Sequence, residues 1–170
     1  LENGKDELVF IDKHAAHGRL IYEQLKEHGK SFAQMLLEPV TVTLDKNEYA
    51  AVLGSLSLLI QAGFEMEDFG AGTVLVRSAP VFLEQADISA SVMEIAGYLV
   101  QNKKDITTEH LDWLYHNVAC RAAIKAGDES HKEELIALAK RLYENPDVRY
   151  CPHGRPVFVV IKRRELEKQF

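Results

Sequence analysis

Two spacings of hydrophobic residues alternate along the 170-residue chain, and each predicts a different kind of element. Short apolar or alternating runs predict strands at 8–11, 40–44 and 157–161, because strand side chains repeat every two residues. Apolar positions three and four residues apart predict helices, because such positions share one helix face. The predicted helices cover residues 15–28, 46–62, 88–102, 107–127, 130–143 and 163–170.

Capping and turn residues mark the limits of several of these elements. Asp45 is suited to cap the second predicted helix, and Gly63 is suited to end it. Gly70-Ala71-Gly72 predicts the turn of a hairpin whose strands cover 64–69 and 73–77.

The order of the elements predicts a mixed α/β fold, since strands stand at both ends with helices and a hairpin between them. The first, second and last predicted strands can share one sheet. Residues 1–44 and 149–170 would then form one lobe, and residues 45–148 an inserted lobe.

Composition narrows the class of protein. Hydrophobic residues make up 46% of the chain, which is enough for a packed core and argues against disorder. The formal net charge is −6, so we expect double-stranded DNA to be bound only weakly by this chain alone. The longest apolar run, 50–60, is too short to cross a bilayer, and we expect a cytoplasmic protein without a membrane segment. Leu1 at the start indicates a piece of a longer protein.

Three short segments, 12–15, 119–126 and 151–156, carry the candidate chemistry. Asp12 and His14 directly follow a predicted buried strand, where a sheet would hold catalytic groups rigidly. The other two segments contain both cysteines of the chain. Thiolates, imidazoles and carboxylates are the ligands that zinc and manganese prefer.

Four of the candidate residues, Asp12, Cys120, Cys151 and His153, also have a structural alternative. Asp12 can simply cap the following helix, and Cys120 can be a small core residue. Cys151 can be a buried thiol, with His153 beside it in an ordinary loop. In an extended chain, however, positions 151 and 153 face the same way, and Pro152 restricts the backbone between them. His17 is expected to be an exposed helical histidine.

Together, the three segments resemble the C-terminal domain of the MutL family of DNA mismatch-repair proteins. The resemblance implies a homodimer, with a dimerisation lobe built from both chain ends and a regulatory lobe inserted between them. It also implies an endonuclease that nicks one DNA strand, with Asp12 and His14 as catalytic residues. His14, Cys120, Cys151 and His153 would bind metal: Zn²⁺ in a structural or regulatory role, and Mn²⁺ or Mg²⁺ for nicking.

Two residues depart from the family pattern, which reads Asp, Gln, His, Ala, two free residues, Glu, four free residues, Glu. Lys13 replaces the glutamine, and Gly18 replaces the first glutamate, whereas Glu23 matches the second. Gly18 supplies no ligand, and Lys13 adds a positive charge beside the expected metal. Both departures weaken the expectation of nuclease activity. Glu23 is expected to be structural or to hold a ligand in place.

A fourth segment looks like the short motif with which bacterial replication proteins dock on the sliding clamp. Its residues are Gln34, Met35, Leu36, Leu37 and Pro39, in a stretch that we expect to be irregular. In such motifs the apolar pair enters a pocket of the clamp and the glutamine forms hydrogen bonds. The alternative is a helix end that leads into a buried strand.

The function expected from these observations is a nucleoid-associated dimerisation domain with an endonuclease-type metal site impaired by Gly18. A non-catalytic, zinc-binding module for dimerisation and clamp docking is the principal alternative, and Gly18 favours it. An unrelated metallohydrolase would require all three segments to match by chance.

Overall fold

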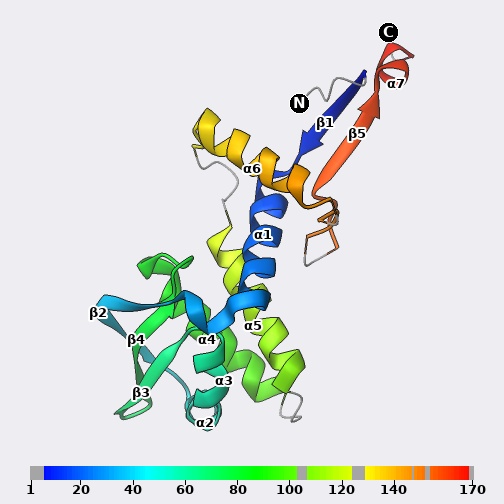
Figure 1. The fold of residues 1–170 in the computed structure, drawn as a ribbon. Helices are drawn as coiled ribbons and strands as arrows, with labels where there is room; N and C mark the ends of the chain where they lie inside the picture. Colours follow the sequence, from blue (N-terminus) through cyan, green and yellow to red (C-terminus); the bar gives the residue numbers. More distant parts are fainter. Residues whose placement is uncertain (1–5, 103–106, 124–128, 147, 152–153, 169–170) are drawn as a thin grey trace. The chain divides into compact units, whose positions relative to one another are not determined.

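A computed structural model describes residues 6–102, 107–123, 129–146, 148–151 and 154–168 of the chain. It confirms the mixed α/β fold (Figure 1). The chain divides into two compact units, one formed by Leu1–Leu20 with Ala123–Phe170 and the other by Ile21–Ala122.

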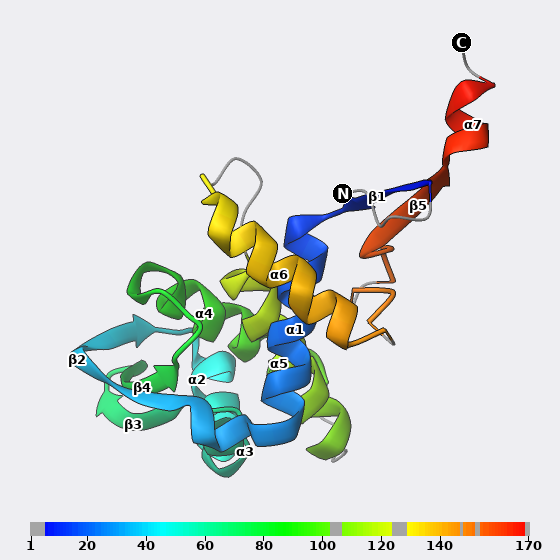
Figure 2. The ribbon, with the colours of Figure 1, turned by 45° about the horizontal axis from the view of Figure 1, so that its top comes forward.

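The unit made from both chain ends contains a two-stranded antiparallel sheet. Strand β1 (Glu7–Ile11) pairs with β5 (Phe158–Lys162), and the two strands lie side by side (Figure 2). In their register Val9 lies opposite Val160. The short helix α7 (Arg163–Glu167) follows β5 directly. The start of α1 (Lys13–His28) and all of α6 (Lys132–Glu144) complete this unit.

Small and branched apolar side chains form the core of this first unit. Ala15, Ala16 and Leu20 of α1 share one buried cluster with Leu138 and Leu142 of α6. The other buried members are Val148, Cys151 and Val157. The alanines at the start of α1 leave room for these neighbours to pack closely against the helix.

The second unit contains a three-stranded antiparallel sheet, in the order β2-β4-β3, together with the larger core. Its strands are β2 (Ala33–Thr43), β3 (Glu65–Gly70) and β4 (Thr73–Pro80). The helical elements of this unit are the 3₁₀ turn η1 (Gly29–Phe32), α2 (Lys46–Gly54), α3 (Leu56–Gln61), α4 (Gln85–Gln101) and α5 (Thr107–Ala122). Helix α4 packs against α2, α5 and β2.

The single sheet expected for the first, second and last strands is wrong. Strands β1 and β5 pair with each other, whereas β2 pairs with β4 of the hairpin. The reason is that β4 buries Val74 and Val76 completely and pairs on both of its sides, so β2 completes the core beside it.

Two further expectations need correction. The segment 34–39 is not irregular but belongs to β2, whose register against β4 shifts between Met35 and Val40. Such a bulge tolerates Pro39, which has no amide to donate to a ladder. The helix expected over 46–62 is divided at Ser55, whose amide donates to the carbonyl of Val52 at 3.0 Å.

The boundaries of the remaining elements differ by a few residues from the predicted ones. The last part of the helix predicted to 127 lies at 124–127, outside the described residues. The lobes expected at 1–44 with 149–170 and at 45–148 stay a prediction, while the compact units change over after Leu20 and Ala122. In the described part of the chain, no helix has the length and apolar character needed to cross a membrane.

Candidate functional site

Backbone hydrogen bonds bring the first and third candidate segments together within one unit. The amide of Asp12 donates to the carbonyl of Val157 at 3.0 Å, and the amide of Val157 donates to Arg149 at 2.9 Å. Tyr150 and Pro156 form an isolated antiparallel bridge in the same place. The turn that holds Cys151 is therefore anchored directly beside the start of α1.

Asp12 caps the start of α1, as the structural alternative to a catalytic or metal-binding role predicted. Its Oδ1 accepts a hydrogen bond from the amide of Ala15 at 3.1 Å, and its carbonyl oxygen accepts from Ala16 at 2.9 Å. The side chain is nevertheless exposed. A carboxylate has two oxygens and several lone pairs, so capping leaves capacity for a further ligand.

Cys151 lies in a tight turn and is 7% exposed. Its amide donates to Arg155 and its carbonyl accepts from Gly154, both at 2.8 Å. Gly154 has a φ of +79°, a conformation that favours glycine. Pro152 and His153 lie outside the described residues, so the pairing of His153 with Cys151 stays a prediction. The buried thiol belongs to the core cluster of this unit.

Two histidines occupy the first turns of α1, near Asp12. His14 is exposed and His17 is half-buried, so the expectation of an exposed helical histidine at position 17 is wrong. Burial lowers the pKa of His17, and the charges of Arg141 and His14 lower it further. The ammonium of Lys13 donates to the hydroxyl of Ser130 at 3.2 Å.

The remaining candidate ligand, Cys120, lies on α5 in the unit formed by residues 21–122 and is partly exposed. It is therefore not one of the fully buried core residues. Glu23 is half-buried in the same unit. Among the residues that the structure describes, no three His, Cys, Asp or Glu side chains converge closely enough to hold a metal ion.

A polar network between α1 and α5 was missed by sequence reasoning. The hydroxyl of Tyr22 donates to Asp112 at 2.5 Å, and its ring stacks on that of His116 with centroids 4.4 Å apart. His116 Nδ1 lies 3.4 Å from the Asp112 carboxylate. Burial and the hydrogen bond to Asp112 raise the pKa of Tyr22. The spacing of Asp112 and His116, four residues apart, was the available signal.

The segment that resembles a clamp-docking motif is largely exposed. Met35 is 82% and Leu37 99% exposed, whereas Leu36 packs against the core of its unit. Successive side chains of a strand point to opposite faces, which separates Leu36 from Leu37. In this folded form, Leu37 is the leucine that is free to enter a partner's pocket.

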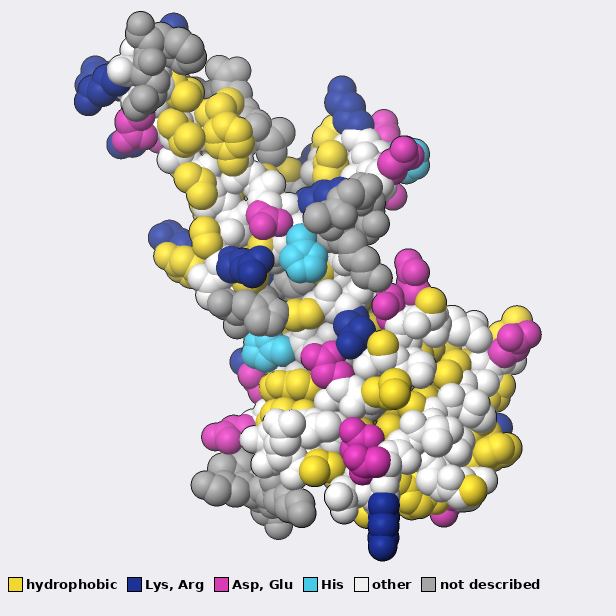
Figure 3. All heavy atoms as spheres, turned by 180° about the vertical axis from the view of Figure 1, so that it is seen from behind, with side chains coloured by type: hydrophobic (Ala, Val, Ile, Leu, Met, Phe, Trp, Pro, Cys, Tyr) yellow, Lys and Arg dark blue, Asp and Glu magenta, His cyan; other side chains and the backbone are white. Residues whose placement is uncertain are grey.

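The β1–β5 sheet carries exposed apolar side chains. Phe10 is 53%, Val159 51% and Val160 41% exposed. Figure 3 shows hydrophobic side chains gathered along this ribbon. A two-stranded sheet of this kind is marginal by itself and gains stability from a partner surface.

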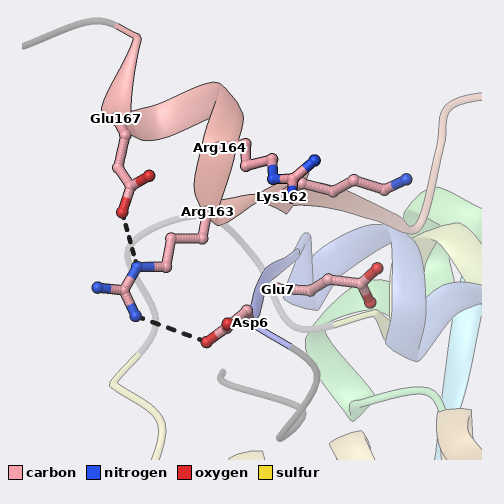
Figure 4. A pocket seen from close by; sticks show the side chains of 6 residues that line it. All are labelled: Asp6, Glu7, Lys162, Arg163, Arg164 and Glu167. Carbon is pink, nitrogen blue, oxygen red and sulfur yellow. Dashed lines mark hydrogen bonds and ion pairs between the residues drawn. The ribbon is translucent and has the colours of Figure 1, made fainter.

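A hollow of about 500 Å³ lies at the end of the same sheet (Figure 4). It is lined by Asp6, Glu7, Lys162, Arg163, Arg164 and Glu167. Arg163 bonds to Glu167 at 2.8 Å and lies 3.6 Å from Asp6, and these carboxylates raise its pKa. Because three cationic and three anionic side chains line the hollow, its charge does not favour one class of ligand.

Comparisons with known proteins give an independent view of the chain. Residues 1–130 match a family model described as the MutL C terminal dimerisation domain. The chain is 38% identical over 175 residues to the DNA mismatch repair protein MutL of Heliobacterium modesticaldum, a match that covers 100% of this chain and 26% of that protein. For the protein of the same name from Caulobacter vibrioides, the identity is 36% over 170 residues, or 98% of this chain and 27% of that protein. The chain thus spans about a quarter of the length of these relatives.

Proposed function

The chain belongs to the family of MutL C-terminal dimerisation domains, and on that basis we propose that it forms the homodimerising, metal-binding part of a mismatch-repair protein. The observation that carries the metal site is the hydrogen bond from Asp12 to Val157, which anchors the Cys151 turn beside α1. A carboxylate, an imidazole and a thiolate of this unit thereby come from adjacent backbone segments.

The side chains present are suited to bind zinc. Cys and His are preferred zinc ligands, which Cys151 and His14 supply, and the resemblance to the MutL family adds Cys120 and His153. Asp12 is an exposed carboxylate, suited to Mn²⁺ or Mg²⁺. A bound ion would polarise a DNA phosphodiester and lower the pKa of an attacking water.

Dimerisation through the β1–β5 sheet is the second part of the proposal. Phe10 and Val159 lie opposite each other in the register and supply exposed apolar surface on one face of the sheet, while Val160 is exposed on the other face. An interface of roughly 1,000 Å² or more would cover the face that carries Phe10 and Val159. Two copies would also present two metal sites to DNA, which one acidic chain binds weakly.

Docking on a bacterial sliding clamp is the third part, supported by the exposure of Met35 and Leu37. The clamp would bring the domain to nucleoid DNA in the cytoplasm without a basic surface on the domain itself. Gly18 favours a second candidate function, in which the chain binds zinc, dimerises and docks on the clamp but does not cut DNA.

Metal content tests the proposed site directly. Elemental analysis of the purified chain should find zinc, and Cys151→Ser should remove most of it. The matched control is Tyr143→Phe, which removes an exposed hydroxyl in the same unit without removing a thiolate. A chain without zinc after exposure to the metal would contradict the proposed site.

A further inference from the structure

Charge is divided unevenly between the two units of the chain. Of its 20 basic and 26 acidic residues, 13 basic and 12 acidic ones belong to the unit formed by Leu1–Leu20 and Ala123–Phe170, whose net charge is therefore +1. The other 7 basic and 14 acidic residues give the unit Ile21–Ala122 a net charge of −7. The acidity that opposes DNA binding thus belongs to the second unit.

Within the first unit, basic residues gather in the segment 148–168. The segment has only two acidic residues but six basic ones, which are Arg149, Arg155, Lys162, Arg163, Arg164 and Lys168. All six are exposed, and Arg163 pairs with Glu167 and Asp6. Four of the six form no ion pair with a residue that the structure describes: Arg149, Arg155, Lys162 and Arg164. The charges of these four cations are therefore available to a partner.

Backbone hydrogen bonds fix the first two cations around the Cys151 turn. The carbonyl of Arg149 accepts from the amide of Val157 at 2.9 Å, and the carbonyl of Arg155 accepts from the amide of Cys151 at 2.8 Å. Two guanidinium groups thus begin from backbone positions that also hold the turn of the proposed metal site. A guanidinium is planar and binds a phosphate through two parallel hydrogen bonds.

The other two cations lie at the far end of β5. Figure 4 shows the side chains of Lys162 and Arg164 extending in the same direction, away from the ion pairs of Arg163. Glu7 lies opposite Lys162 in the register and offsets one of the two charges. Lys162 also belongs to the face of the sheet opposite Phe10, so a dimer that covers Phe10 leaves Lys162 accessible.

We propose that these four cations bind the phosphate backbone of double-stranded DNA. DNA as the partner, and the metal beside the first pair, rest on the proposed function. The two pairs are separated by β5, whose five residues span about 17 Å. A single small anion cannot contact both pairs, whereas a duplex with one charge about every 1.7 Å of its axis can. Arg149 and Arg155 would hold phosphates beside the metal site, and Lys162 and Arg164 phosphates farther along the duplex.

Fluorescence anisotropy of a short labelled duplex, titrated with the full chain at rising salt concentration, tests the proposal. Arg149→Gln with Arg155→Gln should weaken binding by about tenfold or more at low salt. Lys162→Gln with Arg164→Gln should do the same. Each pair should lower the slope of log K against log salt by about 1.8, because each lost phosphate contact removes about 0.9.

The matched control is Lys30→Gln with Lys46→Gln, which removes two exposed cations from the unit Ile21–Ala122. Its net charge equals that of the other double variants, but its affinity for the duplex should equal that of the parent. Equal weakening in all three double variants would mean that net charge alone governs binding, and would overturn the proposed surface. Parental affinity in both variants of the four cations would overturn it as well.

Further outcomes separate this surface from the proposed function. If the parent holds zinc and dimerises but does not bind the duplex at low salt, the surface is wrong while the metal site and the dimer stand. If the parent lacks zinc but its duplex binding still depends on the four cations, the surface stands and the metal site is wrong. Binding of the parent to vesicles of anionic lipid, without binding to the duplex, would assign the cations to a membrane surface and overturn the proposal.

Discussion

The side chains of Ser91 and Asn117 form a hydrogen bond of 2.7 Å between two buried residues, with the serine hydroxyl as donor and the amide oxygen as acceptor. Ser91 lies on α4 and Asn117 on α5, so the bond joins the two helices inside an otherwise apolar core. A buried polar group is tolerated in such a place only because its partner is present.

We expect Asn117→Ala to destabilise the chain by about 1–3 kcal/mol, because it leaves the Ser91 hydroxyl buried without that acceptor. Urea unfolding followed by circular dichroism measures the change. Asn102→Ala is the control, since Asn102 is exposed and its side-chain amide donates to the nearby carbonyl of Tyr98. Equal losses in the two variants would mean that burial of the Ser91–Asn117 bond is unimportant.

Most elements of the fold could be predicted because helix and strand periodicities are local properties of the sequence. The pairing of the strands could not be predicted, because β2 pairs with β4 through residues that are far apart in the sequence, such as Val42 and Val74. The break at Ser55 was also missed, since the apolar pattern continues through it and only Gly54 hints at an interruption.

For the candidate site too, local features could be predicted from the sequence and long-range contacts could not. Ligand types and the capping position of Asp12 could be predicted from local sequence. The proximity of Asp12 to the Cys151 turn rests on bonds between chain ends, which spacing alone does not reveal. The hydrogen bond between Tyr22 and Asp112 could not be predicted either, because the two residues are far apart in the sequence and each occupies an ordinary helical position.

Charge placed on the β1–β5 sheet should prevent dimerisation. Val159→Glu would bury a carboxylate in the proposed apolar interface, at a cost that is not offset without a partner charge. Light scattering should give about twice the 19.2 kDa chain mass for the parent and about one chain mass for the variant. Phe69→Glu, at an exposed position of β3, should remain a dimer.

A monomeric parent chain at micromolar concentration would contradict the proposed dimer. Dissociation of Phe69→Glu as well would indicate that added charge anywhere is sufficient, and that the β1–β5 sheet is not the interface.

Truncation of Leu37 should weaken binding to a bacterial sliding clamp by about tenfold or more, since burying a leucine contributes about 1.5–3 kcal/mol. Leu37→Ala should leave stability unchanged because the side chain is 99% exposed. Surface plasmon resonance with purified clamp measures the affinity. The control is Val81→Ala, another exposed apolar residue of the same unit. Identical affinities for parent and Leu37→Ala would exclude this motif as the docking site.

Gly18→Glu should restore nicking of supercoiled plasmid in the presence of manganese, where the parent chain shows little or none. Position 18 lies four residues after His14 on the same helix, so a glutamate side chain there can bind the same metal ion as His14. A carboxylate there would favour manganese and supply the missing ligand. Adding Lys13→Gln should increase the rate further, because it removes a positive charge beside the metal.

The control for this comparison is Gly18→Gln, which has nearly the same shape as the glutamate but no negative charge. Position 18 is buried, so Gly18→Glu should also lower stability without metal and regain it when manganese is added, because the ion compensates the buried charge. Thermal unfolding with and without manganese measures this difference. Nicking by Gly18→Gln as fast as by Gly18→Glu would show that filling the position, and not ligating the metal, restores the enzyme. Rapid manganese-dependent nicking by the parent chain would show instead that a ligand at position 18 is dispensable.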